Sequence, residues 1–399
     1  MELNEKQKEG LSIAVERYCK GEKYTVISGY AGVGKSTLVK FIISALPNVD
    51  PEKEVVYTSF TGKAAQVLQK KGNKNVSTLH RLLFKSFPRP DGSFVRLPVE
   101  TLEPYKIVIV DECSMVPAEI LKMLLKYPVH IICLGDPGQL PPINKSEDNH
   151  LLDNPHVFLD EVMRQAEESE ILKLSMDIRQ NKPLTPFKGK DVQVLNKNEL
   201  TTGMLLWADQ IICATNATRI SINNKMRELL GKEGDPQDGE KVICLKNNWD
   251  IYSNTENPLV NGTVGYLKNA YTSFIRIPGK LTSDRKTKNL PLIIANFVSD
   301  TYDDYSTVTM DKGLFSESGE SSLDSRTSFM MSRNVNFKDK IPEQFTYGYA
   351  ITGWKAQGSE WNNVLVIEEG FPYNVEEHKR FLYTCVTRAA RRLVIIKKD

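Results

Sequence analysis

The sequence lacks long apolar runs. None of its hydrophobic stretches approaches the length of a membrane-spanning helix. The first ten residues, MELNEKQKEG, are too polar to form a signal peptide. We therefore expect a chain with no membrane partner that works in the cytoplasm.

Paired cysteines are also missing. The sequence has six cysteines but no C-x-x-C pair, and several of the six lie in apolar, strand-like runs. Such cysteines are typical of buried, reduced thiols in a cytosolic compartment, and their scatter argues against a zinc site. They are Cys19, Cys113, Cys133, Cys213, Cys244 and Cys385.

The sequence also has no large excess of positive or negative charge. The 399 residues carry a formal net charge of +2, so any nucleic-acid surface must be a local groove and not a general basic field. Charged residues make up 26% and hydrophobic residues 40%, which is ordinary for a globular chain. The length allows two or three domains, each with its own core.

A glycine-rich motif at residues 24–43 organises the chain. An apolar run from Tyr24 predicts a buried strand, GYAGVGKS follows, and an amphipathic helix comes next. Strand, glycine-rich loop and helix together make a phosphate site, because backbone N–H groups and the helix N-terminus both face the anion. We expect the nucleotide to be held by Gly29, Gly32, Gly34, Lys35, Ser36 and Thr37. Lys35 is expected to meet the β- and γ-phosphates of ATP.

A second motif supplies acidic groups. The β-branched run at 107–110 predicts a strand that ends in Asp111 and Glu112. Asp111, with the Ser36 hydroxyl, is expected to bind Mg²⁺, while Glu112 orients or deprotonates the attacking water. Another predicted strand, at 130–134, leads to Gln139, whose amide is placed to sense a γ-phosphate.

Three weaker signals lie around these motifs. Asn4 is a plausible N-cap for a helix over 5–20, and Gln7 in that helix has an amide that matches an adenine edge, although a solvated surface position is an open alternative. Thr61 and Lys63 stand at one strand-to-helix junction and His80 at another. Such junctions suit anions but are not specific alone.

Residues 84–100 have a different pattern. Short apolar segments that include Phe87 and Phe94 flank Asp91-Gly92, a dipeptide favoured in hairpin turns. A two-stranded hairpin buries little, so this one is expected to project from the surface. A decorative loop is the alternative.

The order of these motifs resembles a known family. GYAGVGKST, SFTGKAA, STLHRLL, IVIVDECSM and LGDPGQLPPI resemble successive motifs of superfamily-1 helicases of the RecD type, including the compact phage Dda helicases. The resemblance implies an α/β fold with two RecA-like lobes built on parallel sheets. It also implies ATP and Mg²⁺ as cofactors, 5′→3′ movement on single-stranded DNA, and a host cytoplasm if a phage encodes the chain.

The resemblance continues into the second half. Arg164 and Arg388 lie in segments like those that reach the γ-phosphate from the second lobe. Asn216 follows a predicted strand at 211–215, and Arg227 in the next helix has a surface salt bridge as its alternative. The segment 345–360 resembles a motif that couples nucleotide to DNA; it contains Thr352 and Lys355, and Gly358 is expected to bind the nucleotide. Trp354 stands there where relatives carry histidine, and either base stacking or packing would suit it.

Residues 239–341 differ from both lobes. Short predicted strands at 242–245, 262–266, 274–277 and 290–297, with polar connections, indicate a small β-barrel, SH3-like in relatives. The acidic, serine-rich stretch 299–326 predicts a mobile loop or a two-stranded arm.

These features predict four segments: a first lobe at 1–160 with a hairpin at 84–100, a second lobe at 161–238 and 342–399, and an inserted barrel at 239–341. We expect an ATP-dependent DNA helicase that acts in replication, recombination or repair. A remodeller of protein–DNA complexes and a P-loop kinase are the alternatives. Expected partners are single-stranded and forked DNA, and a single-strand-binding protein or replisome or recombination proteins, with the chain a monomer. The DNA is expected to contact Thr61, Lys63, His80, Phe94, Asn216, Thr352 and Lys355.

Overall fold

The computed structural model describes residues 2–88, 94–141, 149–161, 169–255, 257–300, 303–316, 318–371 and 374–398. Internal contacts divide the chain into two units. The first comprises Met1–Phe84, Pro98–Thr215 and Thr352–Asp399, and the second comprises Lys85–Leu97 and Asn216–Ile351.

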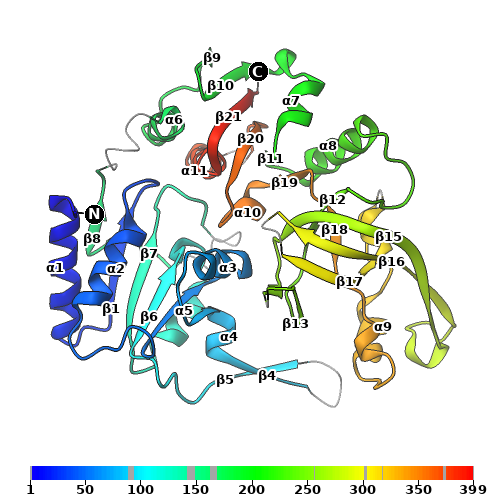
Figure 1. Ribbon diagram of the computed structural model, residues 1–399, viewed down its shortest axis with the longest axis horizontal. Helices are drawn as coiled ribbons and strands as arrows, with labels where there is room; N and C mark the ends of the chain where they lie inside the picture. The colour runs from blue at the N-terminus through cyan, green and yellow to red at the C-terminus, as the bar shows by residue number, and fades with distance from the viewer. Residues whose placement is uncertain are drawn as a thin grey trace. The chain divides into compact units, whose positions relative to one another are not determined.

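The first lobe is built on a six-stranded sheet with the order β3-β2-β6-β7-β1-β8 (Figure 1). Its neighbouring strands are all parallel. The strands are β1 (Tyr24–Gly29), β2 (Val55–Ser59), β3 (Val76–Thr78), β6 (Ile107–Asp111), β7 (His130–Gly135) and β8 (Val157–Leu159). The strands predicted from apolar runs at 24, 107 and 130 are therefore confirmed.

Both faces of this sheet are buried. Alternate residues of each strand point to opposite faces, so Ile27 and Ile109 join one core cluster while Val26 and Val108 join the other. Helices α1 (Glu5–Cys19) and α2 (Lys35–Ala45) cover the first face, and α4 (Leu79–Leu83) and α5 (Ala118–Leu124) cover the second. Helix α3 (Gly62–Lys70) follows β2. The parallel sheet with helices on both faces is the expected RecA-like arrangement.

The second lobe has its own six-stranded sheet, in the order β19-β11-β20-β21-β10-β9. Pairing is parallel for β11 with β20, β20 with β21 and β21 with β10, and antiparallel for β10 with β9. The strands are β9 (Phe187–Lys188), β10 (Val192–Asn196), β11 (Gln210–Cys213), β19 (Ala350–Thr352), β20 (Trp361–Ile367) and β21 (Ala389–Lys397). Its helices in the first unit are α6 (Glu170–Arg179), α7 (Thr202–Trp207), α10 (Gly353–Ala356) and α11 (Val375–Val386).

The second unit contains a five-stranded sheet in the order β17-β16-β15-β12-β18. Every paired neighbour in it is antiparallel. The strands are β12 (Lys241–Cys244), β15 (Val264–Ile277), β16 (Lys288–Ser299), β17 (Asp304–Asp311) and β18 (Phe345–Tyr347), with a separate pair, β13 (Asn248–Tyr252) and β14 (Pro258–Leu259). The described residues form no closed barrel, so the insertion is an antiparallel sheet and the barrel itself stays a prediction.

Two sequence predictions for this insertion are wrong. The strands expected at 262–266 and 274–277 are one long strand, β15, whose pairing with β16 shifts register between Lys268 and Tyr271. The stretch 299–326 was expected as a loop or an arm, but it supplies β17 at the edge of the sheet and leads to helix α9 (Ser325–Ser332). Apolar Tyr305, Val308 and Met310 fill the buried positions of β17, which its acidic and serine-rich composition concealed.

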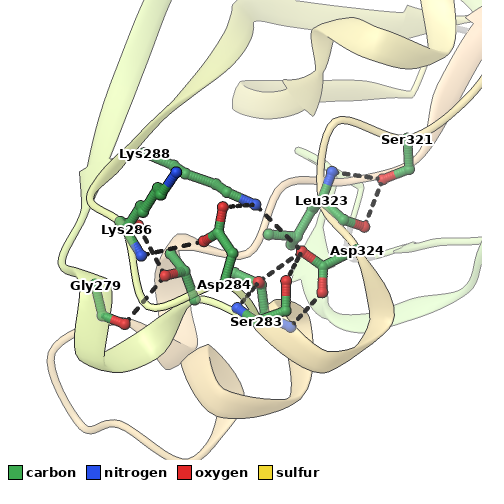
Figure 2. A network of polar contacts seen from close by, with 10 residues as sticks. Gly279, Ser283, Asp284, Lys286, Lys288, Ser321, Leu323 and Asp324 are labelled. Carbon is green, nitrogen blue, oxygen red and sulfur yellow. Dashed lines mark hydrogen bonds and ion pairs between the residues drawn. The ribbon is translucent and has the colours of Figure 1, made fainter.

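The turn that connects β15 to β16 contacts α9 through hydrogen bonds and ion pairs (Figure 2). Asp324 caps α9 and also accepts a hydrogen bond from the Ser283 hydroxyl at 3.1 Å. Lys288 lies 3.4 Å from Asp284 and 3.9 Å from Asp324. An apolar cluster that includes Ile277, Leu281, Leu290 and Met331 lies between the hairpin and the helix. The hairpin and α9 therefore share a small apolar core.

Arg227 makes a buried ion pair and not a surface salt bridge. It lies in α8 (Asn216–Leu229), and its Nε is 2.6 Å from Oε1 of Glu240, whose side chain is fully buried. The guanidinium also lies over the Tyr347 ring and donates to the Gly234 carbonyl. Arg227 thus connects α8 to Glu240, the residue before β12, and to Tyr347 in β18.

The predicted hairpin forms a two-stranded sheet of β4 (Phe84–Pro88) and β5 (Phe94–Pro98). Its Asp91-Gly92 turn and the side chains of Phe87 and Phe94 lie outside the described residues. In the part of the chain that the structure describes, no helix is both long and apolar enough to cross a membrane.

Candidate active site

The phosphate-binding loop connects β1 to α2 as predicted. Gly32 and Gly34 have φ angles of 79° and 81°, a left-handed conformation that glycine adopts without strain. A Cβ on Gly29 would lie 2.7 Å from the Leu159 carbonyl oxygen, so β8 also requires a glycine there. The Lys35 ammonium donates to the Gly29 and Tyr30 carbonyls at 2.7 and 3.0 Å. These are bonds that phosphate oxygens can replace.

Ser36 and Thr37 lie in the first turn of α2, where Ser36 is exposed. Gln7 is only 1% exposed, and its amide donates to the Val33 carbonyl at 3.2 Å and accepts from the Asn4 N–H at 3.1 Å. The predicted N-cap of Asn4 is confirmed as a capping box with Gln7. Gln7 therefore supports the phosphate-binding loop, and its contact with adenine stays a prediction.

The two acidic residues stand at the carboxyl end of β6. Glu112 has a φ of 52°, and its N–H donates to Oδ1 of Asp111 at 3.0 Å. Burial, together with the adjacent Glu112, raises the pKa of Asp111 to about 6, which the Lys35 charge partly offsets. A divalent cation would favour the charged form of this carboxylate.

The donor set at this edge fits Mg²⁺, which prefers hard oxygen ligands. Ser59 ends β2 directly opposite Asp111 in the sheet register. The buried hydroxyls of Ser28, Ser59 and Ser114 have no hydrogen-bond partner within the described part of the chain. Unpaired buried hydroxyls mark a place where water or a ligand is expected.

The loop after β7 carries Gln139. Asp136 is 1% exposed, and it accepts from the Gly138 N–H through its carboxylate and from the Gln139 N–H through its carbonyl. Burial raises the pKa of Asp136. The Gln139 side chain is buried, and its Oε1 has no partner among the described residues. This amide oxygen is available to a water molecule or a nucleotide.

Residues of the second lobe contact this loop directly. The Tyr383 hydroxyl donates to Asp136 at 2.7 Å and accepts from the Ala31 N–H at 3.0 Å. Thr384 accepts from the Leu140 N–H at 3.0 Å, and Gln357 donates to the Leu140 carbonyl at the same distance. The nucleotide loop of the first lobe is thus bonded to α11 and to the segment after α10.

Arg179 is a residue that the sequence did not single out. It ends α6, and its guanidinium lies over the ring of Tyr30 in the phosphate-binding loop. The ring of Tyr30 also packs edge-on against Phe158. Burial lowers the pKa of Arg179, while Tyr30, Tyr383 and Asp136 counteract that shift. Its contact with Tyr30 joins residues 149 positions apart, which no local sequence pattern indicates.

Of the two arginines predicted to reach the γ-phosphate, only Arg388 lies in the described part of the chain. Arg164 lies outside the described residues. Arg388 is 7% exposed, and it donates to the Thr384 and Ser359 carbonyls and to the Thr387 hydroxyl, all in its own lobe. Gly358 has a φ of 76°, and a Cβ there would lie 3.0 Å from Cβ of Ala64. Gly358 therefore allows a close approach to α3.

The residues predicted to meet DNA occupy two units. In the first, Thr61 caps α3, Lys63 is buried, and His80 lies between the rings of Phe60 and Phe84. Thr352 and Lys355 belong to the start of α10, where Trp354 packs against Phe381. Asn216 begins α8 in the second unit, and the side chain of Phe94 lies outside the described residues.

Glu369 is a second residue that the sequence did not reveal. Its carboxylate accepts from the N–H groups of Ala214 and Thr215 and from the Thr215 hydroxyl, at 2.6 to 3.0 Å. It fixes the end of β11 just before Asn216. Because 154 residues separate it from Thr215, no local pattern could have indicated this contact.

Comparison with known proteins agrees with this geometry. A family model described as an AAA domain matches residues 2–201, half of the chain, and a UvrD-like helicase C-terminal domain matches residues 347–396. This chain belongs to the superfamily-1 helicases of the RecD and Dda type. The first match covers the whole first lobe and the start of the second, including β10, and the second match covers the end of the second lobe with Arg388.

Relatives of this helicase are distant in sequence. It is 24% identical to the uncharacterized protein R530 of Acanthamoeba polyphaga mimivirus, over 93% of this chain and 94% of that one. It is 32% identical to the ATP-dependent DNA helicase dda of phage T4 over 37% of this chain, and 25% identical to the ATP-dependent RecD2 DNA helicase of Deinococcus radiodurans over 93%. It spans only 34% and 46% of those two proteins.

Solved structures show the same fold. The Pif1 helicase of Candida albicans aligns with a TM-score of 0.53 and 20% identity, covering 100% of this chain and 95% of that one. Pif1 of Bacteroides bound to single-stranded DNA aligns with the same TM-score, 17% identity and the same coverage. At these identities the likeness concerns the fold alone.

Proposed function

We propose that this helicase hydrolyses ATP to move along single-stranded DNA in the 5′→3′ direction and to unwind duplex DNA. The observation that carries the proposal is the bonding between the phosphate-binding lobe and the second lobe. Tyr383, Thr384 and Gln357 bond to the loops that carry Ala31 and Gln139. A motor needs such contacts, because nucleotide-dependent changes in one lobe must move the other.

The nucleotide chemistry is divided among few residues. Lys35 and the N–H groups of the glycine-rich loop bind the phosphates, and Ser36 and Asp111 hold Mg²⁺, which neutralises charge on the phosphate oxygens. Glu112 orients or deprotonates the attacking water, and Gln139 senses the γ-phosphate. Arg164, Arg388 and Arg179 are the second-lobe cations that can stabilise the transition state.

DNA binding is assigned to residues near strand ends. Thr61, Lys63, His80, Asn216, Thr352 and Lys355 are proposed to contact the strand, mostly through its phosphates. The hairpin 84–100 is proposed to separate the duplex. Forked DNA, a single-strand-binding protein and replication, recombination or repair proteins are proposed partners of a monomer. For the inserted sheet we propose an SH3-like barrel.

A Lys35→Ala variant tests the nucleotide assignment. We expect ATP turnover to be abolished while single-stranded DNA binding stays within about threefold of wild type, because Lys35 addresses nucleotide phosphates and not the DNA. Lys40→Ala is the matched control, since Lys40 is an exposed lysine on the same helix. Loss of both activities in Lys35→Ala would show a folding defect, and turnover at the wild-type rate would refute the assignment.

A further inference from the structure

Tyr383 joins three parts of the active site that are far apart in sequence. It is fully buried in α11, and its hydroxyl lies between the Ala31 N–H of the phosphate-binding loop and the carboxylate of Asp136. The ring packs against Gly138, where a Cβ would lie 2.9 Å from Cε1 of the tyrosine. One side chain of the second lobe therefore touches both nucleotide loops of the first.

The hydroxyl serves two groups that need partners. A buried carboxylate is costly unless hydrogen bonds stabilise it, and Asp136 has two such bonds, from Tyr383 and from the Gly138 N–H. A backbone N–H that is shielded from water also needs an acceptor, and Tyr383 supplies one to the N–H of the half-buried Ala31. Removing the hydroxyl leaves both groups short of one bond.

The loop that Asp136 shapes is the loop that presents Gln139. Its next residue, Leu140, is held on both sides by the second lobe, because its N–H donates to Thr384 and its carbonyl accepts from Gln357. Thr384 follows Tyr383 directly on α11. Two consecutive residues of one helix thus fix the two ends of the segment 136–140.

We propose that Tyr383 is a positioning residue for ATP hydrolysis. By holding Asp136 against the phosphate-binding loop, it sets the distance between Gln139 and the phosphates that this loop binds. The proposal rests on the ATP hydrolysis proposed above. It extends that function by naming α11 as the element that moves Gln139 relative to the bound phosphates when the lobes move.

The test is the Tyr383→Phe variant, which removes the hydroxyl and keeps the ring. We expect kcat for ATP to fall by about 10- to 100-fold, because small displacements of positioned groups have effects of that size. The KM for ATP should change by less than about threefold, since Lys35 and the glycine-rich loop are intact. The result that would overturn the proposal is a kcat within about twofold of wild type.

Tyr347→Phe is the matched control. Tyr347 is buried in β18 of the second unit, and its hydroxyl has no hydrogen-bond partner in the part of the chain that the structure describes. It should keep the wild-type kcat. An equal loss of kcat in both variants would contradict the proposal, because a nonspecific effect of losing a buried hydroxyl would then explain the result.

A double-mutant cycle with Asp136→Asn separates positioning from general stability. If Tyr383 acts through Asp136, the double variant should lose no more kcat than the more severe single variant. Multiplied losses would show independent effects and overturn the proposal. Should Tyr383→Phe fold poorly, as its melting temperature would report, Thr384→Val removes the adjacent bond to Leu140 and should give the same kcat-selective loss.

Two measurements distinguish a failure of this proposal from a failure of the proposed function: the stimulation of ATP turnover by DNA, and basal ATP turnover. Absence of DNA stimulation of ATP turnover in the wild type would refute the coupling to DNA. The comparison of Tyr383→Phe with Tyr347→Phe in basal turnover would still decide the role of Tyr383.

Discussion

The Arg388 guanidinium, two residues beyond the end of α11, donates three hydrogen bonds. Its acceptors are the Thr384 and Ser359 carbonyls and the Thr387 hydroxyl. A transition-state phosphate carries more negative charge than a carbonyl, so exchange of these acceptors for phosphate oxygens is favourable once ATP is bound. The residue is therefore expected to change partners during the cycle.

Alanine substitution of Arg388 or Arg164 should lower kcat by orders of magnitude, as loss of arginine fingers does elsewhere, with a smaller effect on ATP binding. Arg391→Ala is the matched control, because Arg391 is exposed on the strand that follows Arg388. Steady-state ATPase assays and nucleotide titrations measure the two effects separately. A wild-type rate in either variant would exclude that residue from catalysis.

Some residues of the candidate site could be predicted from local sequence patterns, and others could not. Lys35, Asp111 and Glu112 follow strands, and the carboxyl ends of parallel strands meet at one edge, so their convergence was predictable. The contacts of Tyr383 with Ala31 and Asp136 span 352 and 247 residues, and that of Glu369 with Thr215 spans 154. No periodicity encodes such distances, and these residues were missed.

At the scale of elements, the buried pair of Arg227 with Glu240 is one of the contacts that attach α8 to the rest of the second unit. Arg227→Ala would leave Glu240 buried without its cation, which costs roughly 3–5 kcal/mol. Lys225→Ala on the same helix removes only an exposed pair with Glu228 and should cost less than about 1 kcal/mol.

Chemical denaturation of both variants, followed by circular dichroism, measures the difference. A cost for Arg227→Ala no greater than that for Lys225→Ala would show that Glu240 finds other compensation. A large cost for both would indicate that α8 itself is marginal.

The hairpin of β4 and β5 is the element assigned to strand separation. Replacing residues 85–96 by a short Gly/Ser linker should keep DNA-stimulated ATP hydrolysis and remove most duplex unwinding. The physical reason is that a motor without a rigid wedge can advance along the strand but cannot hold the fork open.

Unwinding measured at matched ATPase rates decides the role of the hairpin. Unchanged unwinding by the linker variant would assign separation to another element, such as the inserted sheet. Loss of both activities would contradict the separation of roles between the hairpin and the motor.

Elements were predictable where burial gives a clear pattern. The first-lobe strands β1, β6 and β7 are continuous apolar runs, and they formed where expected, whereas the short strands β3 and β8 were not predicted. In the insertion, β15 has exposed Tyr266, Tyr271 and Phe274, no fully buried position over 268–276, and a register shift in its pairing with β16. Because of this exposed middle part, the sequence pattern indicates two short strands, at 262–266 and 274–277, where the structure has one.

At the scale of the whole molecule, two lobes of like architecture provide different chemistry. The first supplies the phosphate-binding loop and the acidic pair, and the second supplies Tyr383, Thr384 and Gln357.

Because the net charge is only +2, DNA is expected to be held by a few local contacts, and the affinity for DNA should depend only modestly on salt concentration. Function therefore depends on how the lobes respond to nucleotide.

The most direct test of this account is strand displacement from duplexes with a single-stranded tail on either the 5′ or the 3′ side. The account predicts ATP-dependent displacement from the 5′-tailed duplex by the wild type, little from the 3′-tailed duplex, and none by Lys35→Ala. Displacement from the 3′-tailed duplex alone would contradict the proposed polarity. DNA-stimulated ATP hydrolysis with no displacement from either substrate would contradict the claim that this chain unwinds DNA.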